Sequence, residues 1–269
     1  MNAALQKSGQ SVLPASHPDT PLLEMRGIAK TFPGVRALDN VNIALYPGQV
    51  TALIGENGAG KSTLVKILTG IYHPDEGEIL IDGQPVHFST AQDATDAGVT
   101  AIHQETVLFD ELSVGENIYL GHAHRTKLGF VNGAAVIARA QYLLSSLEIT
   151  VDARIKLREL SIAQRHLVAI ARALSVDSRV VIMDEPTAAL SRKEVDDLFR
   201  IVERLKSQGK AILFISHKFD EVYEIADRYA VFRDGCAVGH GLLSEMNERE
   251  IVRLMVGRSV GKAFPTQDR

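Results

Sequence analysis

A glycine-rich segment, GENGAGKST at Gly55–Thr63, constrains the fold more than any other feature of this chain. It fits the spacing G-x-x-x-x-G-K-[ST] in full, and it directly follows VTALI at Val50–Ile54, an apolar run of strand length. After it, Leu64, Ile67 and Leu68 recur at helical spacing. A strand, a glycine loop and an amphipathic helix in this order predict a loop that binds phosphate groups.

The chemistry expected of this loop follows from its residue types. Glycines let the backbone fold so that a row of N–H groups faces inward, and the N-terminus of the following helix adds partial positive charge. Lys61 is expected to reach the terminal phosphates of a nucleotide, and Ser62 to offer its hydroxyl to Mg²⁺.

A second segment, VVIMDEPTAAL at Val180–Leu190, begins as a fully apolar strand and then presents two adjacent carboxylates, Asp184 and Glu185. Open α/β sheets place their ligands at the carboxyl ends of their strands. We therefore expect Asp184 to lie in the outer shell of Mg²⁺ and Glu185 to polarise a water for attack on the γ-phosphate.

Short apolar runs alternate with longer helical stretches from Leu22 onward, which predicts an α/β domain with a largely parallel sheet. The pattern becomes mostly helical between the apolar runs at 100–103 and 180–183, which indicates an inserted helical subdomain at roughly 105–176. We expect flexible tails at 1–20 and 261–269 around a domain at 21–260. Further strands are expected at Thr100–His103, Val180–Met183, Ala211–Ile215 and Tyr229–Phe232.

Composition excludes several classes of protein. With 29 Lys or Arg and 33 Asp or Glu in 269 residues, the net charge is −4, which disfavours a nucleic-acid partner. The single cysteine, Cys236, excludes an intramolecular disulfide and suits a reducing compartment. No apolar run reaches the roughly 18–20 residues that cross a bilayer, and residues 1–20 lack the apolar stretch of a secretory signal.

Seven motifs in order give the chain a resemblance to the nucleotide-binding domain of ABC transporters, and more narrowly to the ATPases of bacterial monosaccharide importers. The resemblance covers about Leu22 to Pro265. It implies a P-loop NTPase fold, with a RecA-like core of mainly parallel sheet, additional antiparallel β strands and an inserted helical subdomain. The motifs are KTFPGVRAL at Lys30, ALIGENGAGKST at Ala52, AIHQE at Ala101, LSIAQRHLVAIARAL at Leu160, IMDEPTAAL at Ile182, ISHK at Ile215 and VFRDG at Val231.

The resemblance implies ATP as substrate, Mg²⁺ as cofactor, and a role for each matching residue. Phe32 corresponds to the aromatic that stacks on adenine, although a Phe in a short strand is otherwise a core residue. Gln104 corresponds to the glutamine that touches the metal or the attacking water, and His217 to the histidine that contacts the γ-phosphate beside Glu185. The catalytic set is Glu185, His217, Gln104 and Lys61, and the metal set is Ser62, Gln104 and Asp184. The nucleotide set is Phe32, Gly55, Glu56, Asn57, Gly58, Ala59, Gly60, Lys61, Ser62, Thr63, Ser161 and Gln164.

The segment LSIAQ at Leu160–Gln164 matches the ABC signature, usually written LSGGQ. Ser161 is expected to cap the helix that follows, so that its hydroxyl and the first amides can face an anion. In ABC proteins that anion is the γ-phosphate of ATP held by the other subunit. Ile162 and Ala163 replace two glycines, which predicts weaker contact, and Ser191 replaces an aspartate that communicates with the opposite subunit.

The resemblance also implies partners. These are a second ATPase domain, transmembrane permease subunits and, indirectly, a periplasmic sugar-binding protein, with the chain lying peripherally on the cytoplasmic face of the inner membrane. Val107, Leu108, Phe109 and Leu112 could form a docking surface for the permease or belong to the core of the subdomain. Because relatives of this branch are commonly about twice as long, the chain is expected to be either a homodimerising subunit or the amino-terminal half of a tandem ATPase.

Other functions are disfavoured. DNA-repair and chromosome-maintenance ABC ATPases carry long coiled-coil or zinc insertions, and ribosome-associated factors carry two ATPase domains with a basic linker. A GTPase would need an N-K-x-D motif, and His217 stands where that motif has Asn. His122 and His124 lack the clustered ligands of a metal site.

Overall fold

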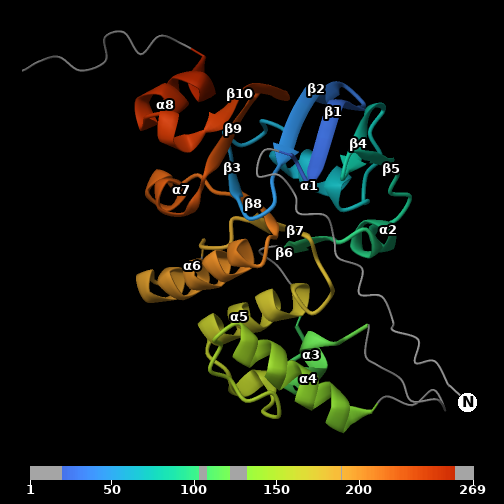
Figure 1. Cartoon of the computed structure of the whole chain (residues 1–269), viewed down its shortest axis with the longest axis vertical. Helices are drawn as coiled ribbons and strands as arrows, with labels where there is room; N and C mark the ends of the chain where they lie inside the picture. Colours follow the sequence, from blue (N-terminus) through green and yellow to red (C-terminus); the bar gives the residue numbers. More distant parts are fainter. Residues whose placement is uncertain (1–19, 103–107, 122–131, 189, 258–269) are drawn as a thin grey trace, which may run out of the picture.

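The computed structural model describes residues 20–102, 108–121, 132–188 and 190–257. In this part of the chain the strands form two sheets, and Figure 1 shows helices packed around them. The strands are β1 (Leu23–Phe32), β2 (Val35–Leu45), β3 (Val50–Gly55), β4 (Glu76–Ile81), β5 (Gln84–Val86), β6 (Val99–Ile102), β7 (Val180–Asp184), β8 (Ala211–Ile215), β9 (Arg228–Arg233) and β10 (Cys236–Leu242). The α-helices are α1 (Lys61–Leu68), α2 (Ala91–Asp96), α3 (Val114–Ile118), α4 (Gly133–Ser146), α5 (Ile162–Ala173), α6 (Arg192–Ser207), α7 (Phe219–Ile225) and α8 (Glu248–Val256). Two 3₁₀ turns are η1 (Leu157–Glu159) and η2 (Leu243–Glu245).

The larger sheet has the strand order β10-β9-β3-β8-β7-β6. Pairing is parallel from β9 through β6, and only the edge pair of β9 with β10 is antiparallel among these. The smaller sheet, β2-β1-β4-β5, is antiparallel throughout. The predicted α/β fold with a mainly parallel sheet is therefore confirmed, and the five predicted strands fall on observed strands, except that His103, the last residue of one prediction, lies outside the described residues.

Successive side chains of a strand point to opposite faces of the sheet, so one strand can contribute to two hydrophobic cores. In β7, Val180 and Ile182 belong to the core between the two sheets, into which α1 also packs. Val181 and Met183 point to the opposite face, where they join the core formed with α5 and α6. Both faces of this strand are covered, which explains why its sequence is apolar without alternation.

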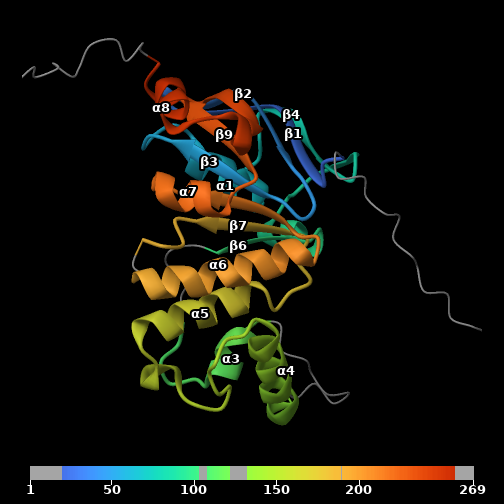
Figure 2. The same cartoon turned by 60° about the vertical axis from the view of Figure 1, so that its left-hand side comes forward.

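In its described parts, the segment between β6 and β7 contains α3, α4, η1 and α5, joined by turns, and no named strand, as its sequence pattern indicates. In Figures 1 and 2, α6 lies between the parallel strands and α5, and α3 and α4 lie at the far end of the molecule. Apolar residues of these helices, such as Val114, Ala140 and Val168, share one core with β7, β8 and α6. The limits given for the subdomain, 105–176, remain a prediction.

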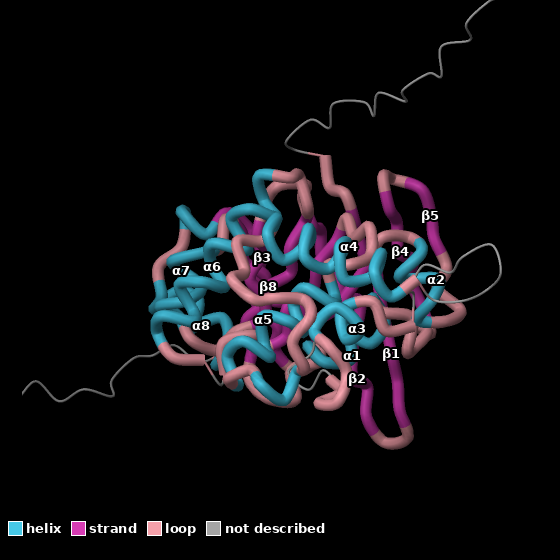
Figure 3. Tube along the Cα trace, turned by 90° about the horizontal axis from the view of Figure 1, so that it is seen from below, coloured by secondary structure: helices cyan, strands magenta, loops and turns pink. Residues whose placement is uncertain are grey.

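Two β-hairpins project from the body in the view from below (Figure 3). One joins β1 to β2, and β1 ends at Phe32 close to the tip of that hairpin. The helices and the parallel sheet fill the rest of this view. The predicted aromatic therefore lies on a strand of the antiparallel sheet, on a different element from the glycine loop.

Candidate phosphate-binding site

The glycine loop joins β3 to α1, as predicted, and its shape requires glycine at particular points. Gly60 caps α1 with φ at 102°, a left-handed conformation. A Cβ atom added there would lie 2.7 Å from the carbonyl oxygen of Ala37 and 2.7 Å from Leu38 Cδ2. At Gly55 a Cβ atom would lie 2.5 Å from the carbonyl oxygen of Phe232. Close packing against β2 and β9 therefore demands these two glycines, in addition to any need to approach a phosphate.

The side chain of Lys61 folds back over the loop. Its Nζ donates hydrogen bonds to the carbonyl oxygens of Gly55 (2.6 Å) and Glu56 (3.0 Å). Burial lowers the pKa of Lys61, and the carboxylates of Glu185 and Asp184 oppose that change by stabilising the charged ammonium. The structure thus brings the lysine of the glycine loop and the two acids that follow β7 into one electrostatic environment.

The remaining predicted residues of the loop lie around this lysine. Ser62 is exposed in the first turn of α1, and Glu56, Asn57 and Gly58 are exposed at the crest of the loop. Ala59 is buried and joins the core between the sheets. The crest of the loop is therefore exposed, whereas Ala59 anchors the loop in the core.

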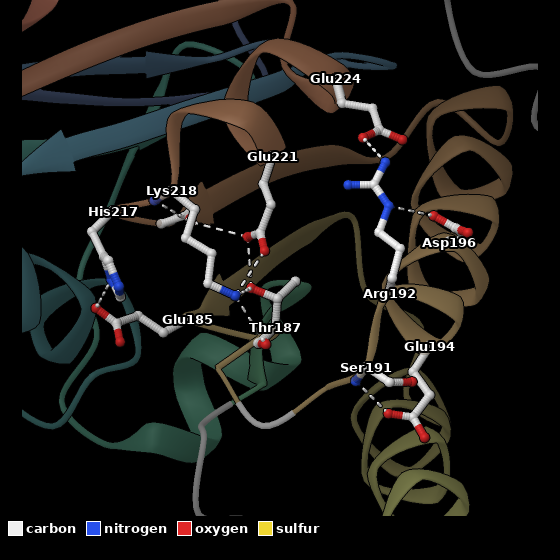
Figure 4. A network of polar contacts seen from close by, with 11 residues as sticks. Glu185, Thr187, Ser191, Arg192, Glu194, Asp196, His217, Lys218, Glu221 and Glu224 are labelled. Carbon is white, nitrogen blue, oxygen red and sulfur yellow. Dashed lines mark hydrogen bonds and ion pairs between the residues drawn. The ribbon is translucent and has the colours of Figure 1, made fainter.

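Glu185 and His217 meet because their strands are neighbours. β7 and β8 pair in parallel with Asp184 opposite Ile215, so the residues that follow each strand lie side by side. The Glu185 N–H donates to the Ile215 carbonyl oxygen at 3.0 Å, and His217 Nδ1 lies 3.3 Å from Glu185 Oε1 (Figure 4). Glu185 also has φ at 48°, an unfavourable value for a residue with a side chain.

A buried polar network behind this pair was not expected from the sequence. Glu221 accepts hydrogen bonds from Thr187 Oγ1 (2.6 Å), Ser216 Oγ (3.1 Å) and Lys218 Nζ (2.9 Å), as drawn for Thr187 and Lys218 in Figure 4. Acidic residues in the first turn of a helix ordinarily lie at the surface, where they interact favourably with the helix dipole. Nothing in the pattern distinguishes buried Glu221 from its exposed neighbour Asp220, so sequence reasoning had no signal for it.

Phe32 is half-buried at the end of β1. Its ring meets that of Tyr72 edge-on, with centroids 5.3 Å apart and an interplanar angle of 63°. Lys30 Nζ lies 5.8 Å from the centre of the Phe32 ring. The ring is therefore held by neighbours yet partly accessible, and its role in stacking on a base stays a prediction.

Ser161 caps α5, which confirms that expectation. Its Oγ accepts from the Gln164 N–H at 3.3 Å, while Gln164 Oε1 accepts from the Ser161 N–H at 3.1 Å, so the two form a capping box. The side chain of Gln164, predicted to contact nucleotide, is engaged in this cap. Ile162, at the first turn, is 78% exposed, so the residue that replaces a glycine presents an apolar side chain to solvent.

The signature segment does not join the Lys61 cluster within one chain. In Figures 1 and 2, α1 and α5 lie on opposite sides of β6 and β7. Ser161 and Gln164 line a separate cavity of about 510 Å³ together with residues of α6, among them Lys193 and Glu194.

Of the remaining predicted positions, the structure describes Ser191 but not the others named here. Ser191 caps α6, and its N–H donates to Glu194 Oε2 at 2.7 Å. Gln104 lies outside the described residues, as do Val107, His122 and His124.

Taken together, the loop, the lysine and the paired Glu185 and His217 form a site suited to bind phosphates and to move a proton beside them. The family described as ABC transporter matches residues 38–188, more than half of the chain. The chain belongs to the ABC transporter family. Its fold is that of an ATP-binding cassette, as two solved structures with 28% identity show. They are a nucleotide-free ATP-binding cassette (TM-score 0.75, covering 88% of this chain and 96% of that one) and a cassette in its ADP conformation (TM-score 0.77, 88% and 99%).

Curated relatives are more similar in sequence to this chain than these two solved structures are. Ribose import ATP-binding protein RbsA 1 of Agrobacterium fabrum is 74% identical over 94% of this chain and 49% of its own length. Ribose import ATP-binding protein RbsA 2 of Rhizobium johnstonii is 69% identical over 100% of this chain and 52% of its own length. A putative ribose/galactose/methyl galactoside import ATP-binding protein of Burkholderia lata is 46% identical over 99% of this chain and 50% of its own. The chain therefore spans about half the length of the curated relatives it matches.

Among the residues that the structure describes, no helix is both long and apolar enough to cross a membrane.

Proposed function

We propose that this chain is an ATP-hydrolysing subunit of an ABC importer that energises the uptake of a monosaccharide across the inner membrane. The observation that carries the proposal is the convergence of Lys61, Asp184, Glu185 and His217 on one site at the carboxyl ends of β3, β7 and β8. The names of the relatives, which are ribose and galactoside import ATP-binding proteins, support the class of cargo. Ribose or a related pentose, hexose or deoxyhexose is therefore the proposed cargo.

The residues present fit ATP and Mg²⁺. The glycine loop is a cradle that Cβ atoms at Gly55 and Gly60 would disrupt, and Lys61 lies over it with its ammonium bonded only to loop carbonyls among the hydrogen bonds described. A hydroxyl from Ser62 and a carboxylate from Asp184 are the hard oxygen donors that Mg²⁺ prefers, and Gln104 is the third proposed ligand. When bound, the metal neutralises charge on the phosphate oxygens.

Each side chain of the site has a proposed task. Lys61 exchanges its bonds to the carbonyl oxygens of Gly55 and Glu56 for charge-assisted bonds to phosphate oxygens. Glu185 polarises a water and accepts its proton, while the water oxygen bonds to the γ-phosphorus and the bond to the ADP oxygen breaks. His217, held beside Glu185, contacts the γ-phosphate, and Phe32 stacks on the base.

Ser161 is proposed to act on the ATP of a second ATPase domain. It caps α5 on the far side of the sheet from Lys61, so one chain presents two separate half-sites. Two domains arranged head to tail would then enclose two ATP molecules, each between Lys61 of one domain and Ser161 of the other. The two domains would close when ATP binds and reopen after hydrolysis, which gives the transporter a two-state switch. The second domain is a copy of this chain or a fused domain.

Transmembrane permease subunits are proposed to dock on the segment near Phe109, which would place the chain peripherally on the cytoplasmic face of the inner membrane. Phe109 is 47% exposed, whereas Leu108 packs against the core. Asn117 is fully buried and holds this turn through bonds from the Phe109 N–H (2.7 Å) and to its carbonyl oxygen (3.0 Å). A rigid turn that exposes an aromatic ring suits a docking surface. A periplasmic sugar-binding protein would deliver the cargo on the other side.

The test is ATP turnover and sugar uptake in proteoliposomes that contain the permease, this chain and the binding protein. Lys61→Ala is expected to abolish nucleotide binding, turnover and uptake together. Arg26→Ala is the control, because the side-chain bonds described for Arg26 form an exposed ion pair with Glu24 (2.8 Å) on β1, so the change should leave all three unchanged. Normal turnover by Lys61→Ala would overturn the proposal.

A further inference from the structure

Glu221 is the one acidic or basic residue in the buried core of the described part of the chain, at 6% exposure. A carboxylate in such a position destabilises the fold unless hydrogen bonds and a counter-charge compensate it. Three donors do so here: two hydroxyls, from Thr187 and Ser216, on Oε2, and the ammonium of Lys218 on Oε1.

These partners come from two different loops. Thr187 belongs to the loop after β7 and lies two residues beyond Glu185, whereas Ser216 and Lys218 flank His217 in the loop after β8. Lys218 Nζ also reaches the Thr187 carbonyl oxygen at 3.3 Å, and Ser216 Oγ accepts from the Lys218 N–H at 3.1 Å. Glu221 therefore ties the two loops together from behind, as Figure 4 shows for Thr187 and Lys218.

The pair on the open side of these loops needs such support. Glu185 and His217 have side chains that are 31% and 63% exposed, and their 3.3 Å contact is long for a hydrogen bond. Glu185 also holds φ at 48°, a conformation that persists only where the surrounding structure enforces it. The direct contact between the two side chains is too weak to fix their separation.

We propose that Glu221 is a positioning residue, which holds the loops after β7 and β8 at the separation that Glu185 and His217 need for ATP hydrolysis. This inference rests on the proposed function. Glu221 itself lies behind the site and touches neither the phosphate-binding loop nor Lys61 among the contacts described. Its loss should therefore reduce turnover while leaving ATP binding intact.

The first test is Glu221→Gln in steady-state ATP hydrolysis by the full chain in its assembled transporter. An amide accepts hydrogen bonds on one side only, so either Lys218 or the two hydroxyls lose their acceptor. We expect kcat to fall at least about tenfold with little change in KM for ATP, since small misplacements of reacting groups cost this much or more. Glu224→Gln is the matched control, because Glu224 lies on the same helix but forms an exposed ion pair with Arg192 (3.1 Å).

Thr187→Val is a second variant, which removes one donor and keeps the shape of the side chain. It should lower kcat in the same way, whereas Thr187→Ser keeps the hydroxyl and should stay close to the wild type. A double variant distinguishes positioning from general destabilisation. In the His217→Ala background, Glu221→Gln should lower kcat much less than it does in the wild type, because the pair it aligns is already broken.

Different results would overturn the proposed function and the positioning role of Glu221. If the wild-type transporter does not hydrolyse ATP, the proposed function fails. If it does, and both Glu221→Gln and Thr187→Val keep normal kcat, the positioning role fails. A rise in KM with unchanged kcat, or an equal loss of kcat in the His217→Ala background, would also overturn it.

Discussion

His217 Nδ1 lies 3.3 Å from Glu185 Oε1, although the two residues are 32 positions apart in the sequence. Parallel pairing of β7 with β8 makes them neighbours, because each follows the carboxyl end of its strand. The separation allows an imidazole and a carboxylate to share a proton or to bracket a phosphate oxygen and a water. The chemistry proposed for this chain depends on this juxtaposition more than on either residue alone.

Alanine variants of two glycines in the loop, Gly60 and Gly58, are expected to differ in stability. Gly60→Ala would place a Cβ atom 2.7 Å from a backbone oxygen at φ of 102°, and we expect it to lower the free energy of unfolding by about 2–4 kcal/mol. Gly58→Ala has open space at φ of 84° and should cost only about 1 kcal/mol. Urea unfolding without nucleotide measures both. Equal losses would show that the steric contact with β2 is not what requires Gly60.

Replacing Ser161 is expected to reduce both the stability of the fold and the ATP-dependent association of two chains. Ser161→Ala removes the cap of α5 and should cost about 1 kcal/mol of stability. Ser113→Ala removes an equivalent capping box from α3 and should cost about the same. Only Ser161→Ala should also weaken ATP-dependent association of two chains, measured by light scattering with Mg·ATP in the Glu185→Gln background. If both variants associate normally, the role of Ser161 in a composite site is wrong.

The burial of His166 is expected to make the free energy of unfolding depend on pH. Burial lowers the pKa of its imidazole below 6.5, although a hydrogen bond with the Pro186 backbone and the charge of Glu194 act in the opposite direction. As pH falls through 6.5, the unfolded chain takes up a proton that the folded ring resists, so the free energy of unfolding decreases. His166→Gln removes this contribution.

Urea unfolding of wild type and His166→Gln at pH 7.5 and pH 5.5 provides the comparison. The wild type should lose more stability between the two values than the variant does, and the difference isolates His166 from the other histidines. An identical loss in both proteins would contradict the assignment of a lowered pKa.

Much of the fold could be predicted because its signals are local. β7 reads as a strand since Val180 to Met183 are all apolar and both faces are covered, and the glycine loop has fixed spacing. Ser161 could be placed as a cap because a serine followed three residues later by glutamine is a recognisable start of a helix.

Other parts of the site have no local signal. The burial of Glu221 depends on hydroxyls from the loops that follow two different strands, and no periodicity distinguishes it from Asp220. Asn117 is similar, since its amide is buried by a turn that it also stabilises. That Gly55 and Gly60 are required by packing against β9 and β2 is likewise a property of the tertiary structure.

The central claim is that Glu185 drives ATP hydrolysis in a site closed by a second ATPase domain. Its most direct test is Glu185→Gln, measured for ATP turnover and, in parallel, for mass in solution with Mg·ATP, with Glu203→Gln on the exposed face of α6 as control. We expect turnover to fall at least about 100-fold, two variant chains to remain associated while ATP persists, and the control to behave as the wild type. Undiminished hydrolysis by Glu185→Gln would contradict the role proposed for Glu185.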